Sequence, residues 1–306
     1  MNDLLDLYEK PAPKNACMLA GWRQWADAGS ISSGLPRYLV EQTGARKIGE
    51  IRPNGLYLFQ FPGTHHYLRP EIKLEDGYRA ELRVKKNEIF YAGNSDDGLF
   101  IFLGDEPHLN VDQYAAAFFD MIETLNIKRV GGVGGVYGSM PYDKDREVSC
   151  AYSLLRLKDE LAQYAVRFSN YEGGATIGSY MLDEAEKRDL EFFVFYAFVP
   201  AYDLSQLSNM LQGMRIENDY KAWYDLMNRF NHMFNLTLDL SDLAQKSEDL
   251  TASMVAKINE LEKKAPGVKV KEYMDALSKR FEEQSFMPLD DVWERELGDI
   301  LEDLDE

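Results

Sequence analysis

The chain has 306 residues, 45% of them hydrophobic, which is enough for one large α/β domain with an appendage or for two domains. The net charge of -18 and the pI of about 4.7 argue against a nucleic-acid partner, which requires a basic face; they do not forbid a local basic patch, but the sequence shows none. Cys17 and Cys150, the two cysteines, lie among apolar or small residues and indicate buried free thiols, not a disulfide framework.

Neither a targeting segment nor a membrane span is predicted. The first ten residues are acidic and lack the basic region and apolar run of a secretory signal peptide. No window approaches the roughly 18 uninterrupted apolar residues that a membrane-spanning helix needs. We therefore expect a cytoplasmic protein without a membrane partner.

The N-terminal part of the chain predicts a short arm followed by strands and one helix. Residues 1–15 form the arm, which Pro11 and Pro13 interrupt. The helix should end at Gly44, because glycine readily adopts the left-handed conformation that closes a helix. The predicted elements are a strand at 16–22, a helix at 31–42, and strands at 47–51 and 56–61.

A β-rich insertion is predicted at residues 69–92. Asp76-Gly77 separates the runs 69–74 and 78–84, and this dipeptide is a strong hairpin signal. Residues 88–92 are expected to add a third strand.

The rest of the chain favours a wound α/β sheet followed by helices. Residues 99–103 form a continuous apolar run, as expected for a central parallel strand. The later predicted elements are a helix at 111–125, a strand running into a glycine-rich turn at 127–142, an extended segment at 143–152, a helix at 154–164, a strand at 166–168, a helix opening at 171–174 and ending at 188, a strand at 192–199, and helices at 217–234, 241–264 and 269–284.

We accordingly predict three parts. Residues 1–202 form an α/β/α core that carries the hairpin insertion, residues 203–287 form a helical C-terminal module, and residues 288–306 form an acidic amphipathic tail. From Phe281 to Glu306 eleven residues are acidic and one is basic, so much of the negative charge belongs to this end of the chain.

The glycine-rich strand raises the question of a nucleotide site. A dinucleotide fingerprint leads straight into a helix, whose N-terminus holds the pyrophosphate. Here Gly132, Gly134, Gly135 and Gly138 are followed by Ser139-Met140-Pro141 and by no helical apolar stripe. We therefore favour the alternative that glycine lets neighbouring backbone approach this strand closely, and we keep Gly135 as a candidate crevice residue.

Neither a metal site nor an activated nucleophile stands out. The four histidines, His65, His66, His108 and His232, lack the spacing that a zinc site needs. No serine lies in a nucleophile elbow, and no nearby positive charge would lower the pKa of the Cys150 thiol. We predict no metal, no cofactor and no catalytic residue.

Two loops are the candidates for a binding crevice, because ligands of wound α/β sheets bind at the carboxyl ends of the strands. The first loop consists of Gly104, Asp105, Glu106, Pro107 and His108, and the second of Tyr171, Glu172 and Gly173. The alternative is that the carboxylates of the first loop are merely solvated and that the tyrosine packs, since position at a strand end is permissive rather than diagnostic.

The acidic tail is a candidate docking helix. Trp293, Leu297, Ile300 and Leu304 fall on one helical face, with acidic residues opposite. Such a stripe suits an apolar groove of a partner, and it equally suits packing on its own or a neighbouring protomer.

Several short motifs follow one another over roughly residues 16–260. They are Gly21-Trp22, Asp27-Ala28-Gly29, Tyr38-Leu39, Arg69-Pro70, Gly104-x-Glu106-Pro107-His108, Tyr171-Glu172-Gly173 and Val199-Pro200. Their order and spacing resemble the family of proteasome assembly chaperone 2 and its archaeal and bacterial relatives.

The resemblance implies an α/β/α sheet similar to the nucleoside phosphorylase and peptidyl-tRNA hydrolase architecture, with a C-terminal helical module. It implies a non-enzymatic, homo-oligomeric protein, similar to ATP-independent chaperones that help proteasome α-subunits to assemble. The expected partners are therefore a second copy and either proteasome α-subunits or another protein. Archaeal relatives can end in a hydrophobic–tyrosine–any-residue tail, whereas this sequence ends Asp303-Leu304-Asp305-Glu306. The alternative function is a phosphorylase- or hydrolase-like enzyme that acts on a small nucleoside-like molecule in the crevice.

Overall fold

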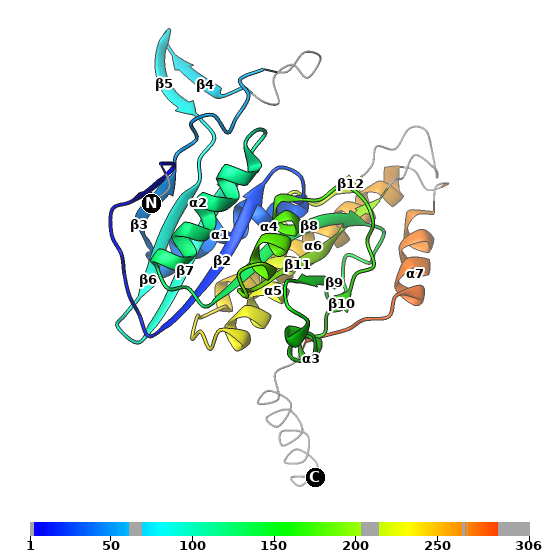
Figure 1. Cartoon of the computed structure of the whole chain (residues 1–306). Helices are drawn as coiled ribbons and strands as arrows, with labels where there is room; N and C mark the ends of the chain where they lie inside the picture. The colour runs from blue at the N-terminus through cyan, green and yellow to red at the C-terminus, as the bar shows by residue number, and fades with distance from the viewer. Residues whose placement is uncertain (1–2, 61–68, 203–213, 265–266, 268, 287–306) are drawn as a thin grey trace.

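The structure, a computed structural model, describes residues 3–60, 69–202, 214–264, 267 and 269–286. Its main sheet has ten strands: β1 (Leu5–Leu7), β2 (Asn15–Arg23), β3 (Arg46–Ile51), β6 (Glu88–Gly93), β7 (Asp97–Asp105), β8 (Arg129–Gly138), β9 (Val148–Tyr152), β10 (Arg167–Phe168), β11 (Glu191–Tyr202) and β12 (Met214–Arg215). They lie in the order β1-β3-β6-β7-β2-β8-β11-β9-β10, and β12 pairs with β11 (Figure 1).

The four central strands are parallel, and the strand next to them on each side is antiparallel to them. Strands β7, β2, β8 and β11 run in one direction, so their carboxyl ends share one edge. Strand β6 is antiparallel to β7, and β9 is antiparallel to β11. The central strands are nearly continuous apolar runs because both of their faces are covered, which is typical of buried parallel strands.

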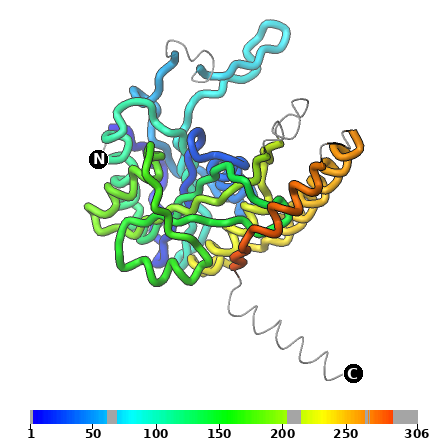
Figure 2. Tube along the Cα trace, turned by 90° about the vertical axis from the view of Figure 1, so that its right-hand side faces the viewer, coloured from blue at the N-terminus to red at the C-terminus, as the bar shows by residue number. Residues whose placement is uncertain are grey.

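Helices cover both faces of the sheet. They are α1 (Ile31–Thr43), α2 (Val111–Thr124), α3 (Lys158–Leu161), α4 (Ile177–Glu186), α5 (Tyr220–Met233), α6 (Ser241–Lys264) and α7 (Val270–Arg280), together with the 3-10 turns η1 (Ala28–Ser30), η3 (Leu155–Leu157) and η4 (Ala162–Tyr164). Helices α2 and α4 pack on one face, and α1 and α5 pack on the other, with α6 and α7 beyond α5 (Figures 1 and 2).

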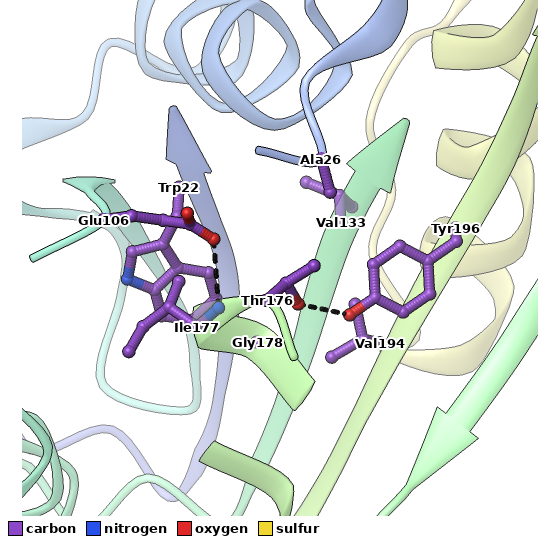
Figure 3. A pocket seen from close by; sticks show the side chains of 9 residues that line it. All are labelled: Trp22, Ala26, Glu106, Val133, Thr176, Ile177, Gly178, Val194 and Tyr196. Atoms are coloured by element: carbon purple, nitrogen blue, oxygen red, sulfur yellow. Dashed lines mark hydrogen bonds between the residues drawn. The ribbon is translucent and has the colours of Figure 1, made fainter. Parts of the chain in front are cut away.

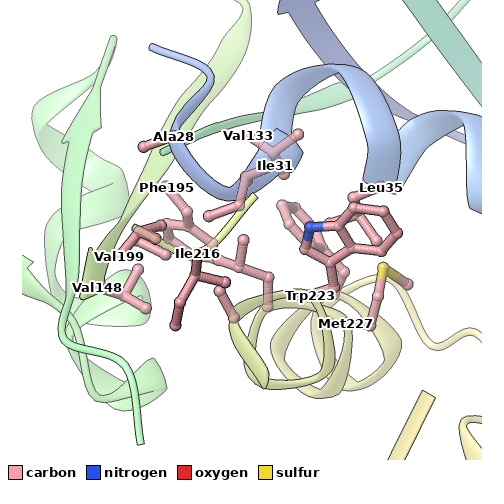
Figure 4. Close-up of a cluster of buried hydrophobic side chains, with 14 of the residues drawn as sticks. Ala28, Ile31, Leu35, Val133, Val148, Phe195, Val199, Ile216, Trp223 and Met227 are labelled. Carbon is pink, nitrogen blue, oxygen red and sulfur yellow. The ribbon is translucent and has the colours of Figure 1, made fainter. Parts of the chain in front are cut away.

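The two core clusters follow the alternation of side chains along the strands. In β11, Phe192 and Val194 face α2 and α4, whereas Phe193 and Phe195 face α5. The mixed α/β fold predicted from the sequence, with helices on both sides of a large central sheet, is therefore confirmed. Trp223 of α5, Leu35 of α1 and Phe195 belong to one buried cluster, as Figure 4 shows.

A buried ion pair fixes the start of α5. Arg146 and Asp219, whose side chains are fully buried, pair through two hydrogen bonds, Nε to Oδ2 at 2.8 Å and Nη2 to Oδ1 at 3.1 Å. Asp219 also caps α5 by accepting from the Ala222 amide. Removing either partner would leave an uncompensated buried charge, so the pair holds the segment before β9 against this helix.

The predicted hairpin forms and projects from the body (Figures 1 and 2). Strands β4 (Glu71–Glu75) and β5 (Tyr78–Arg83) make a separate two-stranded sheet, here named the arm. Asp76 and Gly77 have φ values of 50° and 82°, the left-handed pair that a tight hairpin turn requires. The third strand expected here is instead β6 of the main sheet, which pairs with β3 and β7.

Some predicted elements are wrong in detail. Residues 56–60 form a turn and irregular chain, because the Leu56 carbonyl accepts from the His108 and Leu109 amides instead of from a strand; Phe61 lies outside the described residues. The helix predicted at 154–164 is divided into η3, α3 and η4, and Ala165 follows in a left-handed conformation. The N-terminal segment predicted at residues 1–15 contains β1, which pairs with β3.

Other boundaries agree with the sequence. Gly44 closes α1 with φ 60°, as predicted. The division at residues 202 and 287 stays a prediction, although side chains of α5, α6 and α7 share one buried cluster with the sheet. The residues proposed for a docking helix, Trp293, Leu297, Ile300 and Leu304, lie outside the described residues.

Candidate functional site

The loop 104–108 lies at the carboxyl edge of the parallel strands, as predicted. Asp105 is the last residue of β7, and its side chain is 2% exposed. Its carboxylate accepts two hydrogen bonds from Arg23 at the end of β2, from Nε at 2.7 Å and from Nη2 at 2.9 Å. It also accepts from the Lys86 amide at 2.8 Å, with the Lys85 ammonium at 3.5 Å. Asp105 is therefore not a merely solvated loop carboxylate, because it ties the base of the arm to β2.

Glu106 connects the same edge to helix α4. Its Oε1 atom accepts from the Ile177 amide at 3.0 Å, in the first turn of the helix, where a negative charge is favourable. Burial raises the pKa of this carboxyl, and hydrogen bonding from the Ile177 and Trp25 backbones opposes that rise. Glu106 thus braces two loops from inside the protein.

His108 braces a third segment. Its Nδ1 accepts from the Leu58 amide at 3.1 Å, which requires this nitrogen to be unprotonated. The ring also lies edge-on to Tyr57, with the ring centroids 5.5 Å apart. Burial, helped by the nearby Lys85 charge, lowers the pKa of His108 and favours the neutral ring. The imidazole therefore holds residues 57–58 in place.

Gly104 and Pro107 complete this loop. A Cβ on Gly104 would lie 2.6 Å from Phe102 Cε1 and 2.8 Å from Trp22 Cδ1, so neighbouring side chains use the space that glycine leaves. Pro107 is half-buried between the two bracing side chains Glu106 and His108.

Gly135 permits a close approach of backbone to β8. Its amide donates to the Ala26 carbonyl at 2.8 Å, and a Cβ at this position would lie 2.0 Å from the Ala28 carbonyl oxygen. The loop 24–30 therefore runs directly against the strand. Asp27, in this loop, accepts from the Ser33 amide and the Ser32 hydroxyl, each at 2.9 Å, and so binds an amide in the first turn of α1. These contacts match the close approach that the sequence favours over a nucleotide cradle.

A small pocket opens beside Glu106 (Figure 3). Its lining residues are Trp22, Ala26, Glu106, Val133, Thr176, Ile177, Gly178, Val194 and Tyr196. The free volume is about 10 Å³, which is room for about one water molecule. A nucleoside does not fit this space without a movement of its walls.

The polar wall of the pocket is a cluster of hydroxyl groups. The Tyr196 hydroxyl lies 2.8 Å from Thr176 Oγ1 and 3.0 Å from Ser179 Oγ, and these two side-chain oxygens are 3.1 Å apart. Thr176 also accepts from the Ser179 amide and caps α4. The three hydroxyls therefore satisfy one another and order the start of the helix.

Only one of the predicted crevice residues, Glu106, lines this pocket. Tyr171, Glu172 and Gly173 lie in the exposed segment before α4, and the wall is made by residues 176–178. The sequence does contain a signal for the start of this helix. Thr176, a preferred N-cap residue, comes directly before the apolar Ile177.

Several large apolar side chains in the loops are exposed. Trp25 and Tyr171 are each 72% exposed, and Phe59 and Leu109 are also exposed. Gln24 has a φ of 127°, an unusual value for a residue with a side chain, and Trp25 follows it directly.

Other candidate sites add little to this picture. Within the described residues, no group of three His, Cys, Asp or Glu side chains is placed to hold a metal ion. Burial raises the pKa of both Cys17 and Cys150 to about 12, so both thiols stay protonated at neutral pH. None of the helices in the described part of the chain has the length and apolar character needed to cross a membrane.

Comparison with known proteins gives a consistent result. The model of the PAC2 family matches residues 22–258. A Mycobacterium tuberculosis proteasome-assembly chaperone homologue superposes with a TM-score of 0.66 and 21% sequence identity, covering 78% of this chain and 94% of that one. A Streptomyces avermitilis PAC2 family protein gives a TM-score of 0.64 and 18% identity, covering 79% and 95%.

An archaeal homologue of a proteasome-assembly chaperone, from Pyrococcus furiosus, is also similar. It gives a TM-score of 0.54 and 17% identity, covering 90% of this chain and 99% of that one. These likenesses establish the fold. No curated protein matches the sequence.

Proposed function

Because this chain belongs to the PAC2 family, we propose that it is a non-enzymatic, cytoplasmic protein-binding factor that assists the assembly of other proteins. The structural neighbours described as proteasome-assembly chaperone homologues support this proposal and suggest proteasome α-subunits as candidate partners. We further propose that the chain acts as a homo-oligomer.

One observation carries the proposal: the polar groups at the carboxyl edge bind the protein itself. Asp105 binds Arg23 and the Lys86 amide, Glu106 binds the Ile177 amide, and His108 binds the Leu58 amide. A catalytic site would direct such groups toward a substrate, and the pocket beside them holds about one water molecule. The loop that Glu106 helps to hold instead presents exposed Trp25, one of the residue types that dominate binding energy at protein interfaces.

The proposal is tested by capture from native lysate. The tagged full chain is compared with a Trp25→Ser variant and with a control, Leu155→Ser. Leu155 is 85% exposed and lies in η3. It follows Tyr152, which pairs with Phe193 near the amino end of β11, so it lies at the edge of the sheet opposite to Trp25. We expect proteasome α-subunits among the captured proteins, lost with Trp25→Ser and kept with Leu155→Ser.

A ligand screen tests the enzyme alternative. Purified protein is heated with nucleosides, phosphate and ribose derivatives at high concentration. A ligand at about 100 times its Kd would stabilise the fold by about 2.7 kcal/mol, which a thermal-shift assay detects. Stabilisation by a nucleoside, together with no captured protein partner, would replace the proposed function with an enzymatic one.

A further inference from the structure

The last described residues of the chain fold back onto the body without forming a helix or a strand. We name residues 281–286, from Phe281 to Phe286, the strap. The strap follows α7 and runs to η4, close to α3 (Figure 1). Within the described residues, no backbone-to-backbone hydrogen bond joins residues 282–286 to the rest of the protein. Side chains therefore hold the strap in place.

The first anchor of the strap is Glu283, whose carboxylate is bound at both oxygens. Its Oε1 atom accepts from the Asp145 amide at 2.7 Å, and its Oε2 atom lies 3.1 Å from the Lys144 ammonium. We name this amide and this ammonium the cradle. They lie just before β9, in the segment that the pair Arg146–Asp219 fixes against α5. An amide and an ammonium converging from a fixed segment favour a negatively charged side chain.

The second anchor is Phe286, whose ring lies among three side chains. The ring stacks on Tyr164, with the centroids 5.5 Å apart and the planes 27° from parallel. It lies edge-on to His232, with the centroids 5.9 Å apart. The Cζ atom of Arg229 lies 5.4 Å from the centroid of the Phe286 ring. We name Tyr164, Arg229 and His232 the socket.

Arg229 makes the socket suited to an aromatic ring. This residue is 2% exposed, and its guanidinium donates three hydrogen bonds to carbonyl oxygens. The acceptors are Tyr164 at 2.8 Å, Asp225 at 2.7 Å and Ala165 at 3.3 Å. These bonds use the edge of the planar group and fix its orientation, so its face is left for the ring of Phe286. A desolvated cation is attracted to the face of an aromatic ring, and an aliphatic side chain would lose this attraction.

We propose that the cradle and the socket form one peptide-binding groove, with the strap as its resident ligand. The partner that this groove fits is an extended segment of another protein with a carboxylate three residues before an aromatic ring. Three extended residues span about 10 Å, so the two anchors set the spacing of this motif. The inference rests on the proposed protein-binding function and names the chemistry of the partner. Because side chains hold the strap, a foreign segment with the same two side chains makes the same contacts.

The strap is held weakly enough to be displaced. Ordering its six residues costs conformational entropy at each of them, which one ring and one carboxylate that is 32% exposed must offset. Its tether gives it an effective concentration on the order of 1 mM. With a Kd of about 0.1 mM for the free segment, the groove is then about 90% filled by the strap, and a competitor binds about 10-fold more weakly than to an empty groove.

Peptide binding to the purified full-length chain tests the groove. The variant Phe286→Ala empties the socket, and a labelled, amidated peptide with the sequence of residues 281–286 is followed by fluorescence anisotropy. We expect this peptide to bind the variant about 10-fold more tightly than the natural chain, where the strap competes.

Two altered peptides serve as a matched pair, because the strap has a phenylalanine at each end. The Phe286→Ala peptide should bind the variant chain at least about 10-fold more weakly than the natural peptide, and the Phe281→Ala peptide should bind it equally well. Absence of binding to the variant chain, or equal binding of the two altered peptides, would overturn the proposal.

Proteolysis of the natural chain is a second measurement, which does not depend on the folding of a variant. Arg280, exposed at the end of α7, directly precedes the strap, and trypsin cleaves after arginine. The peptide itself contains no lysine or arginine. An excess of natural peptide should displace the strap and speed cleavage after Arg280 by up to about 10-fold, whereas the Phe286→Ala peptide should not.

Equal cleavage rates with and without the natural peptide would contradict a displaceable strap. Both measurements use purified chain only. Failure to capture a partner from lysate would refute the proposed function, and failure of the peptide to bind would refute the groove, so the two failures are distinguishable.

Discussion

The substitution Gly135→Ala is the sharpest test of what the glycine-rich strand does. The new Cβ would lie 2.0 Å from the Ala28 carbonyl oxygen and 3.0 Å from Ile31 Cδ1. Because the obstacle is backbone, the loop 24–30 must move away and loses the hydrogen bond between the Gly135 amide and the Ala26 carbonyl. Overpacking costs about 1–3 kcal/mol, and a lost buried hydrogen bond costs a similar amount. We therefore expect the free energy of unfolding to fall by about 2–5 kcal/mol.

The measurement is urea unfolding followed by the fluorescence of the four tryptophans. Gly138→Ala in the same strand is the matched control, because its Cβ would meet the Phe198 ring at 3.0 Å and a side chain can shift where backbone cannot. The control should lose less than about 1 kcal/mol. A ligand cradle at this strand would predict lost ligand binding with little loss of stability. Equal stability of Gly135→Ala and the natural chain would therefore refute the close-approach explanation.

Two further substitutions test buried carboxylates. Asp105→Asn removes the charge beside Arg23 and should destabilise the fold by about 1–3 kcal/mol, and the amides of residues 84–87 should exchange hydrogen faster; unchanged exchange there would contradict its bracing role. Burial raises the pKa of the Asp225 carboxyl from 3.8 to about 6. The folded protein therefore binds this proton more tightly than the unfolded chain, and this stabilises the fold fully below pH 3.8. The free energy of unfolding falls by about 3 kcal/mol as the pH rises from 3.8 through 6. Asp225→Asn keeps an acceptor for the Arg146 amide and removes this loss, so urea unfolding at pH 4 and pH 7 should show the variant gaining on the natural chain. A difference that is the same at both pH values would count against the raised pKa.

Local signals explain which parts of the fold were predictable from the sequence. Asp76-Gly77 dictates its own turn, and Gly44 closes its own helix, because each conformation depends on residues adjacent in sequence. The strand predicted at 56–61 fails for the opposite reason. The carbonyl of Leu56 is taken by the amides of His108 and Leu109, more than 50 residues away, which no local pattern reveals.

The candidate site was predictable in position and not in role. A loop at the carboxyl end of β7 could be located from an apolar run and a glycine. That Asp105, Glu106 and His108 each bind a different segment depends on Arg23, Ile177 and Leu58, whose proximity only the folded chain creates. The same holds for the second loop, where Thr176 reaches the pocket and Glu172 does not.

Motifs that are separate in sequence meet around the loop 24–30. A Cβ on Gly29 would lie 2.7 Å from Asp219 Cβ and 3.0 Å from Val199 Cγ2, and the Gly29 carbonyl accepts from Trp223 Nε1 at 3.0 Å. Gly135 supports the same loop from β8. Helix α5 therefore packs on this loop from the side away from α4, and β8 and β11 also contact the loop.

This support changes what Trp25 can contribute to binding. A loop fixed through Ala26, Gly29 and the Glu106 carboxylate has little conformational entropy left to lose, so its exposed tryptophan can bind without the usual ordering penalty. If that reasoning holds, Glu106→Gln, which keeps an acceptor for the Ile177 amide, should leave capture of a partner or second copy nearly unchanged. Glu106→Ala should weaken this capture, although Glu106 itself is not one of the exposed apolar residues. Equal binding by the natural chain and Glu106→Ala would mean that Trp25 acts without the brace.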